Sequence, residues 1–196
     1  MDELIQSFAS LKARKCTNGE LRIIQDEILK SNVLELQSQN VAACLITTPA
    51  DPKGSLGIVK PFITLLLKNL NRYFTFEITV LDDENIRRRI RVSNYQSATR
   101  MSTFMCSIPL CLSEDWSQVQ FNLADFTNRT FNTNYKETVR VQVHANCRLR
   151  RVYFSDEQYN DDQLPNDYRM YRTKMIREKP KKGVIPKKKG GAKKND

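Results

Sequence analysis

The sequence contains no long apolar run. Its 196 residues contain no apolar stretch of about 18, the length that a membrane-spanning helix needs. The longest candidate, Phe62 to Leu67, is only the length of a strand and contains a threonine. The N-terminus opens on Asp2 and Glu3 rather than on a basic region followed by an apolar one, so we expect no secretory signal. We therefore expect no membrane partner.

The sequence also lacks the motifs of catalytic and ligand-binding sites. Its six glycines form no phosphate-binding or dinucleotide fingerprint, and its five cysteines include no Cys-x-x-Cys pair. The single histidine, His144, lies three residues before Cys147, but side chains at odd spacing in one strand point to opposite faces, which argues against a Cys–His dyad. The acidic residues 82–84 fit a solvated hairpin turn better than a metal site. We expect neither an enzyme nor a bound metal or cofactor.

The cysteines have an odd count and irregular spacing. Because we expect no secretory signal, free thiols in a reducing compartment are the better interpretation. The five residues are Cys16, Cys44, Cys106, Cys111 and Cys147.

Positive charge is concentrated at the C-terminus. Residues 172–196 hold eleven lysines and arginines and two acids, whereas residues 1–171 hold twenty-one basic and twenty acidic residues. The tail of lysine, proline and glycine cannot bury enough apolar surface to order itself, so we expect a flexible cationic segment. Such a tail favours a polyanionic partner. It has no aromatic residue after Tyr171, so its binding should be electrostatic and weakly sequence-selective.

Most of the chain between the ends alternates apolar and polar residues with a period of two, which predicts strands. The clearest run places Phe74, Phe76, Ile78 and Val80 on one face. With their counterparts Val119, Phe121, Val139, Val141 and Val143, these residues are the predicted core. Phe62 to Leu67 is read as a strand rather than a helix because it is short. Many short strands separated by turns predict an antiparallel β-sandwich of the jelly-roll kind over about residues 18–155.

Helical signals are few. Leu4, Ile5, Phe8 and Leu11 recur at helical spacing, so residues 1–15 are either a short amphipathic helix or a frayed terminus. A short helix should start at 123–126, and 165–171 should form a helical turn. The resulting division is a divergent N-terminal segment 1–17, a sandwich with its C-terminal extension over 18–171, and a Lys-rich tail 172–196.

Arginines form the candidate binding residues of the body. Arg87, Arg89 and Arg91 alternate along one strand and should emerge in a row on one face, about 6–7 Å apart. The row either binds an acidic partner or is a solubilising face paired with Glu77. Arg88 falls on the apolar face, so we expect it near an edge or with its head reaching to water. A second group that could extend the row is Arg148, Arg150 and Arg151, and the tail adds Lys181, Lys182, Lys187, Lys188 and Lys189.

Several segments together resemble the cilia- and flagella-associated protein 20 family. The matching runs include Thr48 to Lys53, Tyr73 to Glu77, Val80 to Asp83, Arg87 to Arg89 and Ser93 to Ser97. The most specific are Val141 to Arg148 and Arg150 to Asp156. The resemblance covers about residues 18–171. Residues 1–17 do not match the family's longer, aromatic-rich start, and the Lys-rich tail is not typical of it, which indicates a divergent paralogue.

The resemblance implies a jelly-roll sandwich, shaped like carbohydrate-binding modules, in the axoneme of the cilium or flagellum, with the basal body as a further site. It implies a place at the inner junction, where the B-tubule closes onto the A-tubule, with tubulin and a protein like the parkin co-regulated gene product as partners. Stabilising the doublet and supporting motility follow from that place. The alternatives are a nuclear or nucleic-acid-associated protein using the same basic groups, which the aromatic-free tail disfavours, and a carbohydrate-binding module, which rests on shape alone.

Overall fold

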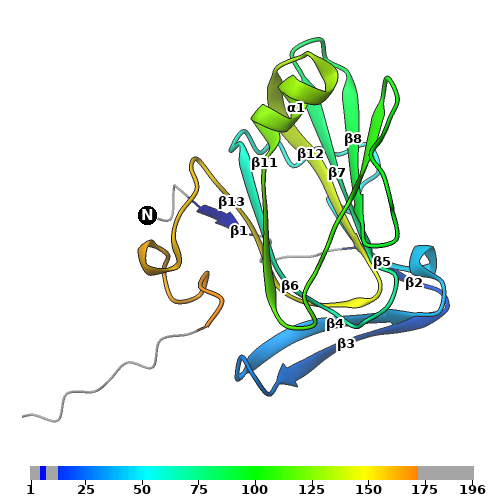
Figure 1. Ribbon diagram of the computed structural model, residues 1–196, viewed down its shortest axis with the longest axis vertical. Coiled ribbons are helices and arrows are strands. Elements are labelled where there is room, and N and C mark those ends of the chain that lie inside the picture. Colours follow the sequence, from blue (N-terminus) through cyan, green and yellow to red (C-terminus); the bar gives the residue numbers. More distant parts are fainter. Residues whose placement is uncertain (1–4, 8–12, 172–196) are drawn as a thin grey trace, which may run out of the picture.

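The computed structural model describes residues 5–7 and 13–171, which form two β-sheets packed face to face (Figure 1). Sheet A has the order β11 (Ser117–Asn122), β6 (Phe62–Asn69), β13 (Cys147–Ser155), β4 (Ser31–Ser38) and β3 (Gly19–Asp26), and β1 (Ile5–Ser7) also pairs with β13. Sheet B has the order β2 (Ala13–Cys16), β5 (Cys44–Thr48), β12 (Tyr135–His144), β7 (Thr75–Asp82), β8 (Arg87–Ser93), β10 (Met105–Pro109) and β9 (Arg100–Met101). The predicted sandwich is confirmed, and β8 with β10 is a parallel pair in otherwise antiparallel sheets.

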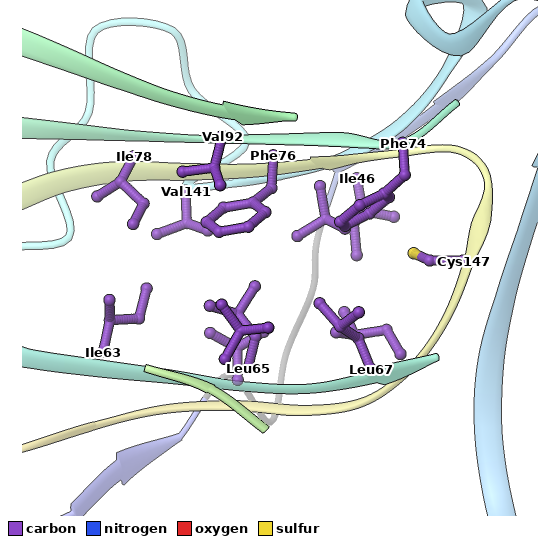
Figure 2. Close-up of a cluster of buried hydrophobic side chains, with 14 of the residues drawn as sticks. Ile46, Ile63, Leu65, Leu67, Phe74, Phe76, Ile78, Val92, Val141 and Cys147 are labelled. Carbon is purple, nitrogen blue, oxygen red and sulfur yellow. The ribbon is translucent and has the colours of Figure 1, made fainter. Parts of the chain in front are cut away.

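The core lies between the two sheets, as the alternation predicts. Figure 2 shows Phe76, Ile78 and Val141 of sheet B facing Ile63 and Leu65 of sheet A. Eight of the nine residues predicted inside are buried, and Phe121, on the edge strand β11, is half-buried against the same core. Because a slip of one residue would turn every one of these side chains outward, this burial fixes the strand register. Phe62 to Leu67 is part of β6, which confirms the strand.

A short helix, α1 (Leu123–Phe131), starts where the sequence predicts it. The side chain of Asn122 caps it by accepting a hydrogen bond from the backbone of Asp125 at 3.0 Å, and Asn132 ends it in the left-handed conformation. Two single turns, η1 (Val41–Ala43) and η2 (Asp161–Gln163), are the other helical pieces described. Residues 165–168 form a single hydrogen-bonded turn, in which Tyr168 N donates to the carbonyl of Pro165 at 2.8 Å, and bends follow to residue 171. No helix in the described part of the chain is long and apolar enough to cross a membrane.

The chain changes sheets between β12 and β13. Asn146 holds this crossing, because its side chain accepts a hydrogen bond from Ser38 N at 2.7 Å and donates one to the carbonyl of Tyr73 at 3.1 Å. His144 therefore ends a strand of sheet B, whereas Cys147 begins a strand of sheet A. The argument that the two lie on one strand was wrong. The His144 ring and the Cys147 thiol are separated by the change of sheet, not by the alternation of side chains along one strand.

The two sheets differ in what covers their outer faces. On sheet A, Leu66, Tyr153 and Val33 form a second apolar cluster outside the sandwich. The chain after β13 lies over this cluster, with Leu164 and Met170 buried in it and the Tyr168 ring 5.3 Å from that of Tyr153. In Figure 1 this segment lies beside β13. Trp116 is also buried in this outer cluster.

Two expectations for the N-terminal part were wrong. Residues 5–7 and 13–16 are strands that pair with β13 and β5, so the amphipathic helix is excluded there. Cys16 and Cys44 form a disulfide, which ties β2 to β5, so the prediction of free thiols fails for this pair. Cys106, Cys111 and Cys147 are free.

Candidate interaction surface

The outer face of sheet B carries the predicted arginine row. Residues that pair directly across neighbouring strands share a face, and Glu77 on β7 pairs with Arg91 on β8. Arg87, Arg89 and Arg91 therefore emerge together on the side away from the core, as the sequence predicted. We call this side, from β5 to β9, the sheet B outer face.

Glu77 neutralises part of the row. One of its carboxylate oxygens lies 2.7 Å from Arg91 Nη2, and the other lies 3.6 Å from Arg89 Nε. The two arginines cover the carboxylate, whose side chain is 7% exposed. The alternative of a row paired with Glu77 thus holds for two of the three arginines. Arg87 is exposed and has no carboxylate within 4.0 Å among the described residues.

The structure adds Arg100, which the sequence analysis missed. Ser107 on β10 pairs with both Arg91 and Arg100, so Arg100 lies on the same outer face, one strand beyond Ser107. Arg100 is exposed. It was missed because β9 has only two residues, too few to show alternation. The sheet B outer face therefore presents two exposed arginines without a carboxylate partner among the described residues, Arg87 and Arg100, on either side of the pair that Glu77 partly neutralises.

Arg88 is neither at an edge nor reaching to water, which corrects the expectation. Its side chain is 6% exposed, and its Nε donates to Asp82 at 2.7 Å while Nη2 donates to Glu84 at 3.1 Å. Its Nη1 donates to the carbonyl of Thr103, and its guanidinium lies 5.3 Å from the centre of the Phe131 ring. Burial by itself raises the pKa of Asp82, but the hydrogen bonds from Arg88 and Ile86 outweigh it and hold that pKa below its usual range.

The acidic turn is consequently more than a solvated turn. Asp82 is fully buried, and Asp83 accepts hydrogen bonds from the backbone and side chain of Asn134 at 2.9 and 2.7 Å. Within residues 5–7 and 13–171, no three His, Cys, Asp or Glu side chains gather as a metal ion would require.

The second basic group lies on the other sheet, so it does not extend the row. Arg148, on β13, donates to Glu35 at 2.7 Å and to Asp26 at 3.0 Å, and Arg22 binds the same Glu35 at 2.7 Å. We call these four residues the sheet A ion cluster. Trp116 Nε1 donates to Asp26 at 3.2 Å. Burial alone raises the pKa values of Asp26 and Glu35, but their hydrogen bonds outweigh it and lower both.

The remaining basic residues have structural partners or lie outside the described residues. Arg150 donates to the carbonyls of Arg169 and Met170, and the Arg151 guanidinium lies 4.8 Å from the centre of the Tyr168 ring. Both side chains thus hold the segment that covers sheet A. The tail lysines 181, 182, 187, 188 and 189 lie outside the described residues.

His144 is buried on the sheet B outer face, with 9% of its surface exposed. Burial lowers its pKa, the charge of Glu77 opposes that shift, and the charge of Arg91 adds to it. The folded protein therefore holds this imidazole neutral more strongly than the unfolded chain does.

This burial gives a prediction for acid stability. The contribution of His144 is complete above about pH 6.5, the ordinary pKa of histidine, and is lost as the pH falls below that value, because only the unfolded chain then binds the proton readily. The free energy of unfolding should fall by up to about 1.4 kcal/mol per pH unit below pH 6.5 through this one group. Urea denaturation of wild type and His144→Gln at pH 7.5, 6.5 and 5.5 measures it. Equal slopes in the two proteins would contradict the prediction.

Comparison with known proteins identifies the family to which this chain is similar. The family model described as the CFA20 domain matches residues 5–172. The chain is 53% identical over 158 residues to a Chlamydomonas reinhardtii protein named cilia- and flagella-associated protein 20, covering 81% of this chain and 83% of that one. Proteins of the same name from Paramecium tetraurelia and Caenorhabditis elegans are 52% and 49% identical, covering 81% and 79% of this chain and 83% and 76% of theirs.

Proposed function

Since this chain belongs to the CFA20 domain family, we propose that it is a non-enzymatic structural protein of the axoneme that docks on doublet microtubules through the sheet B outer face. Its role is in cilia or flagella, because its relatives are named cilia- and flagella-associated protein 20. The proposed place is the inner junction, where the B-tubule closes onto the A-tubule. Tubulin and a protein like the parkin co-regulated gene product are the proposed partners, and doublet stability is the proposed benefit.

The observation that carries the docking proposal is the contrast between the two outer faces. On sheet A, the chain after β13 covers an apolar cluster, and the basic side chains of Arg22 and Arg148 are tied to Asp26 and Glu35. On sheet B, Arg87 and Arg100 project from a sheet face with no carboxylate within 4.0 Å among the described residues. A broad face with exposed guanidinium groups suits an acidic protein surface, because such groups steer encounter and fix orientation.

The nucleic-acid alternative finds less support in this face. Proteins that bind single strands without sequence preference stack bases on aromatic side chains beside their basic groups. The strand positions that share the outer face with Arg91, such as Glu77, Gln142, Thr47 and Ser107, are not aromatic. The electrostatic part of any binding would remain, so a direct comparison at matched salt separates the two functions.

Reversing the two exposed arginines, as in Arg87→Glu/Arg100→Glu, should weaken docking about tenfold at physiological salt and flatten its salt dependence. These two are chosen because reversing Arg89 or Arg91 would also leave the Glu77 carboxylate unpaired. The unfolding midpoint should hardly move, since exposed substitutions usually cost little stability. Cosedimentation of the full chain with salt-stripped ciliary doublets, at several salt concentrations, measures the effect.

The matched control is Lys30→Glu/Arg129→Glu, which reverses two exposed charges away from this face, in the β3–β4 turn and on α1. It should bind doublets like wild type. If both double variants lose affinity equally, only net charge matters and the outer face is not the docking surface. Tighter binding of wild type to duplex DNA than to doublets at the same salt would favour the nucleic-acid function instead.

A further inference from the structure

The free edge of sheet B ends in an exposed apolar hairpin tip. Residues 102–104 join β9 to β10, and together with Met101 and Met105, the strand residues that border them, we call them the hairpin tip. Met101 is 61% exposed and Phe104 is 60% exposed, and Met105 beside them is half-buried. Large exposed apolar side chains that cluster, rather than lie singly, mark interaction sites. Phenylalanine, methionine and arginine are also the residue types enriched in the cores of protein interfaces.

The hairpin tip is held rigidly by its own backbone and by a buried charge. Ser102 N donates to the carbonyl of Met105 at 2.8 Å, and Met105 N donates to Ser102 Oγ at 3.2 Å, which closes the turn. The carbonyl of Phe104 accepts a hydrogen bond from Arg89 N at 2.8 Å, and that of Thr103 accepts one from the buried Arg88 at 2.6 Å. Phe104 is therefore presented by a pre-organised turn, so binding would cost little ordering of the backbone.

Two exposed arginines lie near the hairpin tip, both on the sheet B outer face. Arg100 comes directly before Met101, and Arg87 comes directly before the Arg88 that holds Thr103. Both are exposed. The nearby carboxylates of Asp82 and Glu84 are already bound to Arg88. The outer-face side of the tip is therefore cationic, and a complementary surface would carry free carboxylates on one side of an apolar pocket.

We propose that the hairpin tip is a second docking element, which inserts Phe104 and Met101 into an apolar pocket bordered on one side by carboxylates on a protein of the doublet. This proposal rests on the proposed function and adds to it an edge contact in the plane of sheet B. A protein pocket suits this tip better than a lipid surface, because the fixed turn offers only a few apolar side chains, and their shape is constrained by Arg88 and Arg89.

The test compares Met101→Ser/Phe104→Ser with wild type for binding to salt-stripped ciliary doublets. Because buried aromatic anchors contribute a large share of binding energy, affinity should fall about thirtyfold, and the ratio should be the same at low and high salt. The control Ile28→Ser/Val59→Ser removes two other exposed apolar side chains, which are 50% and 68% exposed, and should bind like wild type. Met101→Leu/Phe104→Leu should restore most of the affinity, and thermal melting checks that every variant folds.

The outcomes separate this proposal from the one on which it rests. If wild type and the serine variant bind doublets equally, the hairpin-tip proposal is wrong and the docking function stands. If wild type does not bind doublets at all, both are wrong. If the tip variant loses binding only to vesicles of phosphatidylcholine with one-fifth phosphatidylserine, the tip meets lipid and the protein-pocket proposal is overturned.

Discussion

Replacing Arg148 with methionine is expected to lower the free energy of unfolding by about 3–5 kcal/mol at pH 7, since removing one partner of a buried ion pair strands the other. Two carboxylates are stranded here, because Arg148 binds both Asp26 and Glu35, and each of their side chains is 1% exposed. The lower part of the range is the better expectation. Arg148 is itself 29% exposed, Glu35 keeps Arg22, and Asp26 keeps Trp116.

The pH dependence of this loss is the sharper measurement. In wild type the pKa values of Asp26 and Glu35 are lowered in the fold, so their contribution to stability is present above about pH 4 and is lost as the pH falls through those lowered values. Without Arg148, both pKa values should be higher than in wild type, because one of the hydrogen bonds that offset burial is lost, and a protonated carboxyl needs no cation. The gap between variant and wild type should therefore narrow as the pH falls from 7 towards 4. Urea denaturation at several pH values measures it.

The control for Arg148 is Arg129→Met. Arg129 also pairs with a carboxylate, Asp125 at 2.9 Å, but the two side chains are 78% and 49% exposed. Such surface pairs contribute little, so this change should lower the free energy of unfolding by less than about 0.5 kcal/mol in the same urea denaturation experiment. A loss for Arg148→Met that is no larger than this, or one that widens at low pH, would show that the sheet A ion cluster does not stabilise the fold as argued.

Replacing Arg88 with methionine is expected to cost about 3 kcal/mol of stability and to loosen the hairpin tip as well. The change leaves the Asp82 carboxylate, whose side chain is 0% exposed, with the Ile86 backbone but no cation. It also frees the Thr103 carbonyl and removes the guanidinium beside Phe131. Arg88→Lys should recover only part of the stability, because one ammonium cannot reach Asp82, Glu84 and Thr103 in the geometry of a guanidinium.

Two measurements check this second prediction. Chemical denaturation gives the loss of stability, and native-state hydrogen exchange at the amides of 102 to 105 reports the hairpin tip directly. The exchange of these amides should speed up more than that of β12, at the opposite side of β7. If stability falls but the tip amides keep their wild-type protection, Arg88 supports the core alone and does not anchor the tip.

The sequence predicts best where one residue's environment depends on its near neighbours. Alternation identified β7, β8, β11 and β12, because the inward face of each strand appears in the sequence as an apolar residue at every second position. The same reasoning placed Arg87, Arg89 and Arg91 on one outer face. It also raised the pairing with Glu77, since hairpin partners lie close in the chain.

Prediction failed where the partner comes from far away or the element is too short to carry a pattern. Arg88 looked misplaced on an apolar face because the acidic turn seemed solvated, yet the buried Asp82 and the distant Phe131 make its burial stable. Arg148 looked like part of a free basic group, although its carboxylates lie more than a hundred residues earlier. β1, β2 and β9 are two to four residues long, so no period could be read from them.

The segment that lies over the outside of sheet A makes the sandwich a directional building block. With Leu164 and Met170 buried against Tyr153 and Leu66, the segment after β13 covers one broad side of the sandwich, while Arg87 and Arg100 are exposed on the other. A copy turned over would present the covered outer face of sheet A to its partner. Every copy bound to a filament would therefore have to face it with the sheet B outer face. The side that meets the filament would then be set by the shape and charge of a single chain.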